Sequence, residues 1–293
     1  MNDAPYASTL EAAVSGARRR HVDLLGVRVP YWVYGPEDAA DTIVAFHGFR
    51  GDHHGLEPVA AFLPGVRVIM PDLPGFGETP PMPDRAHDLD AYAAFAAEFV
   101  RAVAPGAVVL GHSFGSIVVS AAIAAGLDAP RLILVNPIGA PALSGPRGIL
   151  TRLAVFYYWL GAKLPARVGT WLLRNGLIVR VMSLAMVKSR DAAMRRFVHD
   201  QHDRYFSGFS DRDVLREAFV ASVSHDVGEF APAIRMPTLL VAADRDDITP
   251  IEAERALRDA LPAARLVEVA GVGHLIHYEK PAEAASAIRS FLA

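Results

Sequence analysis

Short apolar runs rich in β-branched residues alternate with segments of helical period along most of the chain. The runs that predict buried strands lie at residues 42–46, 66–70, 108–110, 132–135, 238–242 and 265–269. Helical spacing follows most of these runs, most clearly at residues 89–103, at 250–261 and from Pro281 onward. The succession of strand, helix and strand predicts an α/β fold, with a mostly parallel central sheet covered by helices on both faces.

The N-terminal region departs from this alternation. Apolar residues occupy every second position from Val27 to Val33, with Gly26 and Pro30 as interruptions, which predicts an edge hairpin within residues 21–35. Residues 1–20 end in three consecutive arginines, and we expect them to form a polar, weakly helical arm with solvated charges.

A second departure begins after Pro137. Residues 138–231 are helical in pattern and contain no β-rich run. We therefore expect an inserted helical cap there, between the two parts of an α/β core at residues 1–137 and 232–293.

Composition excludes several classes of protein. The 293 residues are 52% hydrophobic, which suits one large domain with an insertion, and the net charge of −3 argues against nucleic-acid binding by the whole chain. The chain has no cysteine, so disulfides and thiolate nucleophiles are excluded. Residues 1–14 lack the basic start and apolar core of a signal peptide, and no apolar run is long enough to span a membrane. We expect a cytoplasmic protein without an integral membrane segment.

The stretch at residues 108–118 carries the strongest chemical signal. A β-branched run ends at Gly111, and a helical run begins after Gly115, so Ser113 stands at a sharp turn between a strand and a helix. Glycines two places away on each side allow the strand and the helix to pass closely. Such a turn exposes the serine hydroxyl, although a serine between glycines in an ordinary turn gives the same five-residue pattern.

A serine hydroxyl needs a base, and the base needs an orienting acid. Among the 11 histidines, His274 lies in a Gly-rich loop directly after a predicted strand, at the sheet edge where Ser113 emerges. Three carboxylates, Asp244, Asp246 and Asp247, follow the preceding strand, and spacing alone does not choose among them.

Together with His47-Gly48 after an early strand and the loop Pro71-Asp72-x-Pro-Gly-x-Gly, this order of residues resembles the α/β-hydrolase superfamily, in its capped, esterase- or lipase-like members with a serine nucleophile. The resemblance implies a triad of Ser113, His274 and Asp246. Asp246 is chosen because residues 243–250 align with a Gly-x-x-Asp-x-x-x-Pro pattern, in which alanine replaces the glycine here.

The same resemblance implies the rest of the site. The backbone N–H groups of Phe49 and Phe114 would form an oxyanion hole, and no metal or organic cofactor is required. We assign the surroundings of the substrate to His47, Gly48, His112 and Trp159, although a structural role in its loop is the favoured interpretation of His47. The adjacent His53 and His54 lack a placed carboxylate in the sequence, so we expect no metal there.

Departures from family patterns narrow the reaction. A serine at the turn, where haloalkane dehalogenases and epoxide hydrolases have aspartate, argues against both reactions. The loop after His47-Gly48 lacks the Ser-Gly-Pro-Gly continuation of the C–C bond hydrolases. Ester hydrolysis is the favoured prediction. C–C bond hydrolase, lyase or acyltransferase chemistry on the same triad is the alternative, and a non-catalytic ligand-binding relative is disfavoured by the complete set of three residues.

The predicted cap has an unusual charge distribution. Residues 129–190 contain nine basic and no acidic residues, interleaved with large apolar side chains. Two interpretations stay open: the apolar residues pack on the core beneath solvated charges, or the cap contacts an anionic membrane surface or a lipid ester. The predicted partner is therefore a small-molecule or lipid ester with a hydrophobic acyl group.

Overall fold

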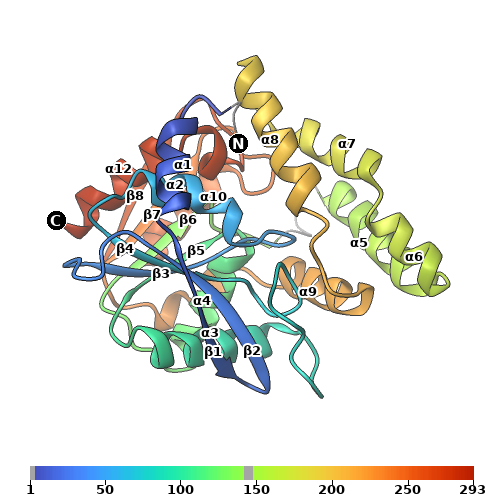
Figure 1. Ribbon diagram of the computed structural model, residues 1–293, viewed down its shortest axis with the longest axis horizontal. Coiled ribbons are helices and arrows are strands. Elements are labelled where there is room, and N and C mark those ends of the chain that lie inside the picture. Colours follow the sequence, from blue (N-terminus) through green and yellow to red (C-terminus); the bar gives the residue numbers. More distant parts are fainter. Residues whose placement is uncertain (1–3, 142–147) are drawn as a thin grey trace.

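The computed structural model describes residues 4–141 and 148–293, and its centre is one eight-stranded sheet (Figure 1). The strand order is β1-β2-β4-β3-β5-β6-β7-β8, in which β2 runs antiparallel to β1 and β4 and every other pair is parallel. The strands are β1 (Arg18–Leu24), β2 (Val27–Tyr34), β3 (Thr42–Phe46), β4 (Arg67–Pro71), β5 (Val108–His112), β6 (Leu132–Val135), β7 (Thr238–Ala243) and β8 (Ala264–Val269). The predicted α/β fold with a mostly parallel sheet is confirmed.

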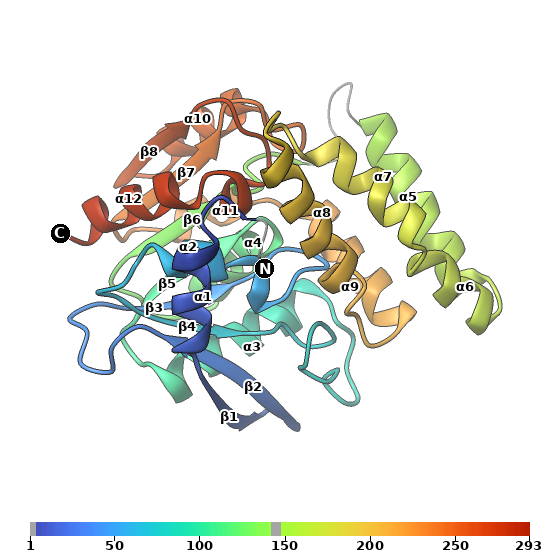
Figure 2. The ribbon, with the colours of Figure 1, turned by 45° about the horizontal axis from the view of Figure 1, so that its top comes forward.

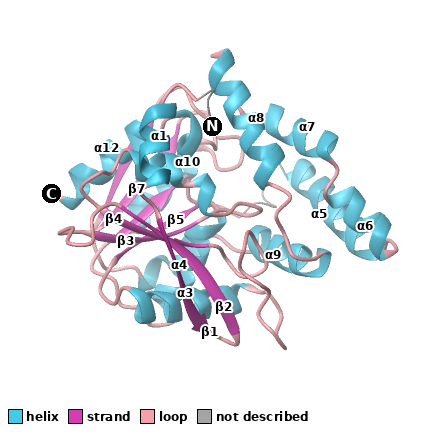
Figure 3. Cartoon of the chain, viewed as in Figure 1, coloured by secondary structure: helices cyan, strands magenta, loops and turns pink. Residues whose placement is uncertain are grey.

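Helices cover both faces of this sheet (Figure 3). On one face lie α3 (Leu89–Val103), α4 (Phe114–Ala124) and α10 (Ile251–Ala260), and on the other lie α2 (Glu57–Ala61), α11 (Ile276–Glu279) and α12 (Pro281–Leu292). Alternate residues of β3 serve the two faces: Val44 and Phe46 pack with α3 and α4, whereas Ile43 and Ala45 pack with α2. Burial on both faces explains why the inner strands β5, β6 and β7 are almost continuously apolar.

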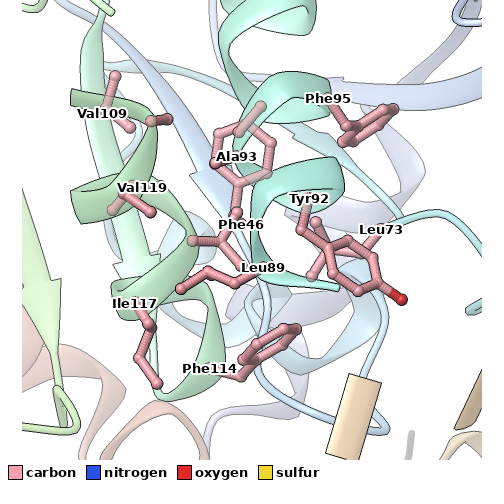
Figure 4. Packing of buried hydrophobic residues seen from close by; sticks show 14 of the residues in the cluster. Phe46, Leu73, Leu89, Tyr92, Ala93, Phe95, Val109, Phe114, Ile117 and Val119 are labelled. Atoms are coloured by element: carbon pink, nitrogen blue, oxygen red, sulfur yellow. The ribbon is translucent and has the colours of Figure 1, made fainter. Parts of the chain in front are cut away.

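Helix α3 shows how sequence determines these elements. The side chain of Asp88 accepts a hydrogen bond from the Ala91 N–H and so caps the first turn. Leu89, Tyr92 and Phe95 then recur at helical spacing and point into the core beside Phe46 (Figure 4). The observed helix has the bounds predicted from this period.

The N-terminal arm differs from its prediction. Residues Ala7–Ser15 form helix α1, but Arg18–Arg20 belong to β1, where Arg18 is opposite Val33 and Arg20 is opposite Tyr31. The hairpin therefore begins three residues earlier than expected. Backbone pairing at a sheet edge tolerates exposed charged side chains, and Arg18 and Arg20 both bind the carboxylate of Glu37.

Between β6 and β7 the described chain is helical. It comprises α5 (Gly148–Lys163), α6 (Ala166–Leu173), α7 (Gly176–Met186), α8 (Ala192–Tyr205), α9 (Arg212–Ser224) and the 3₁₀ segment Val227–Ala233. Figures 1 and 2 place α5, α6 and α7 at one end of the molecule, outside α8 and α9. Among the described helices, none is long and apolar enough to cross a membrane.

Candidate active site

Ser113 occupies the sharp turn between β5 and α4. Its backbone has φ 53° and ψ −118°, a strained conformation that costs a residue with a side chain about 1–3 kcal/mol. Flanking glycines permit the turn, because a Cβ on Gly111 would lie 2.4 Å from the carbonyl oxygen of Gly115, and one on Gly115 would lie 2.3 Å from that of Phe46. The Ser113 N–H donates to the Val135 carbonyl at 3.1 Å. The predicted strand-turn-helix geometry is therefore present.

Ser113, His274 and Asp246 form a continuous hydrogen-bonded chain. His274 Nε2 lies 2.7 Å from Ser113 Oγ, and His274 Nδ1 lies 2.7 Å from Asp246 Oδ2. Asp246 follows β7 and His274 follows β8, so the carboxyl ends of parallel strands bring these residues together. His274 and Asp246 are buried, and Ser113 is partly exposed.

The three candidate acids have different partners. Asp244 Oδ1 accepts the Gly271 N–H at 2.7 Å, which ties together the loops after β7 and β8. Asp247 pairs with the ammonium group of Lys188. Of the three, Asp246 is the one whose carboxylate contacts His274, in agreement with the register that the resemblance favours.

The environment of Asp246 stabilises its ionised form. Its Oδ1 accepts the N–H of Ile248 at 2.7 Å and that of Thr249 at 3.3 Å, and its Oδ2 accepts the side-chain amide of Asn136 at 2.8 Å. Burial alone would raise the pKa of Asp246, but His274 and these hydrogen bonds outweigh it and hold the pKa below its usual value. The carboxylate is therefore charged at neutral pH and can orient the imidazole.

Sequence reasoning missed Asn136. This residue directly follows β6 and has φ 43°, in the left-handed region that asparagine tolerates better than most residues. Its N–H donates to the Val241 carbonyl at 2.8 Å. The available signal was an asparagine directly after a buried strand at the sheet edge that carries Ser113. Its partner Asp246 is 110 positions away, so spacing could not reveal the contact.

Phe49 and Phe114 are the two predicted oxyanion donors. Phe114 begins α4, where backbone N–H groups are free of intrahelical partners, and Phe49 lies in the loop after β3. Within residues 4–141 and 148–293, no oxygen accepts a hydrogen bond from either N–H. Gly48 brings the loop against the turn, because a Cβ there would lie 3.1 Å from Ser113 Cβ. The role of the two N–H groups as oxyanion donors stays a prediction.

The two neighbouring histidines are buried and neutral. His47 Nε2 accepts the Leu73 N–H at 2.8 Å, and its Nδ1 donates to the Gly48 carbonyl at 2.8 Å, contacts that fit the structural interpretation of His47. Burial lowers the pKa of His47, and burial together with nearby His274 lowers the pKa of His112 to about 3. Substrate binding by Gly48 and His112 stays a prediction.

An aromatic cluster surrounds the side chain of Phe49. Its ring lies 5.5 Å from Tyr158 of α5, 5.6 Å from Phe219 of α9 and 6.0 Å from Phe76, between ring centroids. Trp159, which we expected beside the substrate, is not in this cluster: 47% of it is exposed and its ring stacks on Phe156. Helical geometry explains why Tyr158 lies in the cluster and Trp159 does not, because consecutive residues of α5 point about 100° apart.

Arg50 joins the loop after β3 to the helices between β6 and β7. Its side chain is 1% exposed and donates from Nε to the Phe206 carbonyl at 2.9 Å and from Nη2 to the Leu173 carbonyl at 2.8 Å. The guanidinium also lies over the ring of Phe206. The charge patterning of the sequence gave no sign of this residue, because its partners are two backbone carbonyls and the hydroxyl of Tyr158, all from distant segments and none of them charged.

One group of side chains has metal-ligand composition. Ligand atoms of Asp52, His53 and His54 lie within 4.8 Å of one another. The sequence did not place a carboxylate against the two imidazoles, whereas in the structure His54 Nδ1 lies 3.1 Å from Asp52 and His53 Nδ1 lies 2.8 Å from Asp72. These contacts account for the cluster as a buried hydrogen-bond network, and the expectation of no metal stays a prediction.

The comparisons with known proteins identify the family. A model described as "Alpha/beta hydrolase family" matches residues 43–287, and the chain therefore belongs to the α/β-hydrolase family. The resemblance inferred from the motifs is confirmed.

Individual relatives are distant. Lipase 1 of Psychrobacter immobilis is 24% identical over 264 residues, which cover 86% of this chain and 77% of that protein. A thermophilic esterase from Thermogutta terrifontis has a TM-score of 0.72 at 22% identity, covering 94% of this chain and 98% of its own. A bacterial membrane phospholipase A has a TM-score of 0.73 at 19% identity, covering 98% and 91%. At these identities the structural likeness shows the fold.

Proposed function

We propose that the protein hydrolyses carboxylic esters with hydrophobic acyl groups, through Ser113, His274 and Asp246. The observation that carries the proposal is the unbroken chain from Ser113 Oγ through His274 to Asp246, with 2.7 Å at both contacts, at a strained turn. The names of the relatives, a lipase, an esterase and a phospholipase, support an ester as the substrate.

Acylation would begin at the serine. His274 Nε2 takes the hydroxyl proton as Ser113 Oγ attacks the ester carbonyl, and Asp246 stabilises the imidazolium that forms. The oxyanion of the tetrahedral intermediate accepts hydrogen bonds from the N–H groups of Phe49 and Phe114. The carbon–oxygen bond to the alcohol then breaks, and His274 returns the proton to the departing alcohol.

Deacylation repeats these steps with water. His274 removes a proton from a water molecule, whose oxygen attacks the acyl-enzyme carbonyl. The same two N–H groups stabilise the second oxyanion, and collapse releases the carboxylic acid while His274 gives the proton back to Ser113 Oγ. His274 mediates every proton transfer in this cycle.

The aromatic cluster supports a hydrophobic acyl group. Phe49 is both an oxyanion donor in this proposal and a contact of Tyr158 and Phe219, so apolar surface begins beside the reacting carbonyl. We take residues 138–231 as the cap that supplies this surface, and residues 1–137 and 232–293 as the core. Lipid-like esters, whose acyl chains leave water on binding, are the substrate class that such surroundings favour.

Labelling and turnover together test the proposal. Incubation with a fluorophosphonate should add mass to the peptide that contains Ser113, and Ser113→Ala should abolish labelling and the hydrolysis of a panel of p-nitrophenyl esters. Ser290→Ala, at an exposed serine of α12, is the matched control and should change neither.

The outcomes separate the alternatives. Labelling of another serine would overturn the assignment of the nucleophile. Labelling of Ser113 without turnover of any ester would favour C–C bond cleavage, lyase or transferase chemistry on the same triad. Absence of labelling would favour a ligand-binding relative.

A further inference from the structure

Large apolar side chains are exposed on the outer helices. Nine exposed hydrophobic residues lie in α5, α6 and α7, whereas the rest of the described chain contributes three. The nine, which we call the outer apolar face, are Leu153, Val155, Phe156, Trp159, Val168, Trp171, Leu177, Val181 and Leu184. The exposed fraction reaches 65% for Trp171 and 74% for Leu177. Concentration of such residues on one part of a surface marks an interaction site.

Packing within the protein does not explain this face. On α7, Leu177, Val181 and Leu184 recur at helical spacing and are exposed, while the opposite side buries Val179 and the hydroxyl of Ser183. This helix is therefore apolar on its exposed side as well as on its packed side, unlike a helix that only covers a core. In Figures 1 and 2, α5, α6 and α7 form the outermost layer at their end of the molecule.

The charged side chains on the three helices of the face are all basic. Helices α5, α6 and α7 contain no aspartate or glutamate. Arg152, Lys163 and Arg167 have no carboxylate partner among the residues that the structure describes, in contrast to Arg180, which pairs with Asp203. The surface thus combines exposed aromatic and aliphatic groups with uncompensated cations.

We propose that the outer apolar face of α5, α6 and α7 docks on the surface of an anionic lipid bilayer. Apolar and aromatic side chains enter the interfacial region of a bilayer, and flanking Lys and Arg residues bind anionic headgroups. A second copy of the chain fits less well, because a two-fold symmetric contact through this face would bring together two surfaces whose helices carry basic and no acidic residues.

Docking does not require the triad, so it can hold or fail independently of the proposed ester hydrolysis. It would still bear on access to the site, because α5 presents Phe156 to the outside and Tyr158 to Phe49. A lipid bound at this face would therefore be one helix away from the aromatic cluster.

Vesicle binding by the Ser113→Ala protein tests the proposal without hydrolysing the lipid. The probe is co-flotation with vesicles of phosphatidylcholine and phosphatidylglycerol in equal amounts, compared with phosphatidylcholine alone. Binding should be at least tenfold tighter to the anionic vesicles and should weaken as salt rises. Brominated lipids should quench tryptophan fluorescence, because Trp159 and Trp171 lie on the face and the third tryptophan, Trp32, is buried.

Two double variants, each compared with a matched control double variant, locate the contact. Trp171→Ser with Leu177→Ser should reduce anionic-vesicle binding at least tenfold, whereas Val220→Ser with Val267→Ser, at exposed sites outside the face, should not. Arg152→Gln with Arg167→Gln should weaken it by about fivefold per cation, and Arg28→Gln with Arg235→Gln far less. When the same substitutions are introduced into the protein that retains Ser113, each variant should keep wild-type activity on a water-soluble short ester.

Three results would overturn the proposal. These are equal binding to neutral and anionic vesicles, unchanged binding by the Trp171 and Leu177 double variant, and a dimer in sedimentation analysis that the same double variant converts to a monomer. The last would assign the face to a second copy of the chain. Absence of ester hydrolysis by the wild-type protein, with vesicle binding intact, would contradict the proposed function alone.

Discussion

Asn136 Nδ2 donates a 2.8 Å hydrogen bond to Asp246 Oδ2, the same oxygen that His274 Nδ1 contacts at 2.7 Å. Asn136 therefore acts on the imidazole through the carboxylate, as a positioning residue. Its left-handed backbone lets the amide point across the sheet edge from the end of β6 to the loop after β7.

Asn136→Gly should lower kcat by about tenfold, because glycine keeps the left-handed backbone and removes a hydrogen bond to a charged group that contributes about 1.5–3 kcal/mol. KM should change little. Stopped-flow acylation with a p-nitrophenyl ester separates the effect on kcat from the effect on KM. Asn136→Gln is the control, because it keeps a side-chain amide but changes its position. An effect on KM alone would contradict the positioning role.

Asp246→Asn should lower kcat by roughly 10⁴, since an amide cannot stabilise the imidazolium and favours the wrong tautomer. Asp244→Asn and Asp247→Asn are the matched controls, because these carboxylates contact Gly271 and Lys188 instead. Steady-state kinetics of the three variants compare the contributions of the three carboxylates directly. If Asp244→Asn proves the most damaging, the register of the loop is wrong.

Much of the fold was predictable because the signals are local. The bounds of β3 and α3 follow from apolar runs and helical spacing, and the turn at Ser113 follows from two glycines and a change of period. The triad order was readable because parallel strands deliver their carboxyl ends to one edge.

The missed features all depend on contacts between distant segments. Asn136 meets Asp246 across 110 positions, and Arg50 is buried against carbonyls up to 156 positions away. The arginines of β1 join the sheet through backbone hydrogen bonds, which cannot be predicted from the polarity of their side chains.

Glu254→Gln should raise stability at pH 8 and leave it nearly unchanged near pH 4. Burial, and then the charge of Asp246, raise the pKa of Glu254 well above its usual value of 4.5. The folded protein therefore holds a proton that the unfolded chain releases, and stability falls as pH rises from 4.5 toward the folded pKa. Thermal unfolding across pH should show a shallower decline for the variant. Parallel curves for the two proteins would contradict a protonated Glu254.

Arg50→Met should lower both Tm and the rate of fluorophosphonate labelling. The change leaves the buried carbonyls of Leu173 and Phe206 without their donor, at a cost of about 1–3 kcal/mol each, and it releases the loop that carries Phe49. Arg174→Met is the matched control, because Arg174 also donates to a carbonyl of this region, that of Phe209, but lies outside the loop. Equal labelling by both variants would show that Arg50 affects stability without positioning Phe49.

Acyl-chain preference should rise steeply and then level off. Each methylene that leaves water contributes about 0.8 kcal/mol, so kcat/KM should increase by up to about fourfold per carbon from acetate until the apolar surface beside Phe49 is filled. Tyr158→Ala removes one ring of that surface and should move the plateau to longer chains, while acetate turnover changes little. Val220→Ala, at an exposed site on α9, should leave the profile unchanged. A flat or falling series from acetate to octanoate in the wild-type protein would remove the hydrophobic acyl group from the proposal, yet ester hydrolysis by Ser113 would still stand.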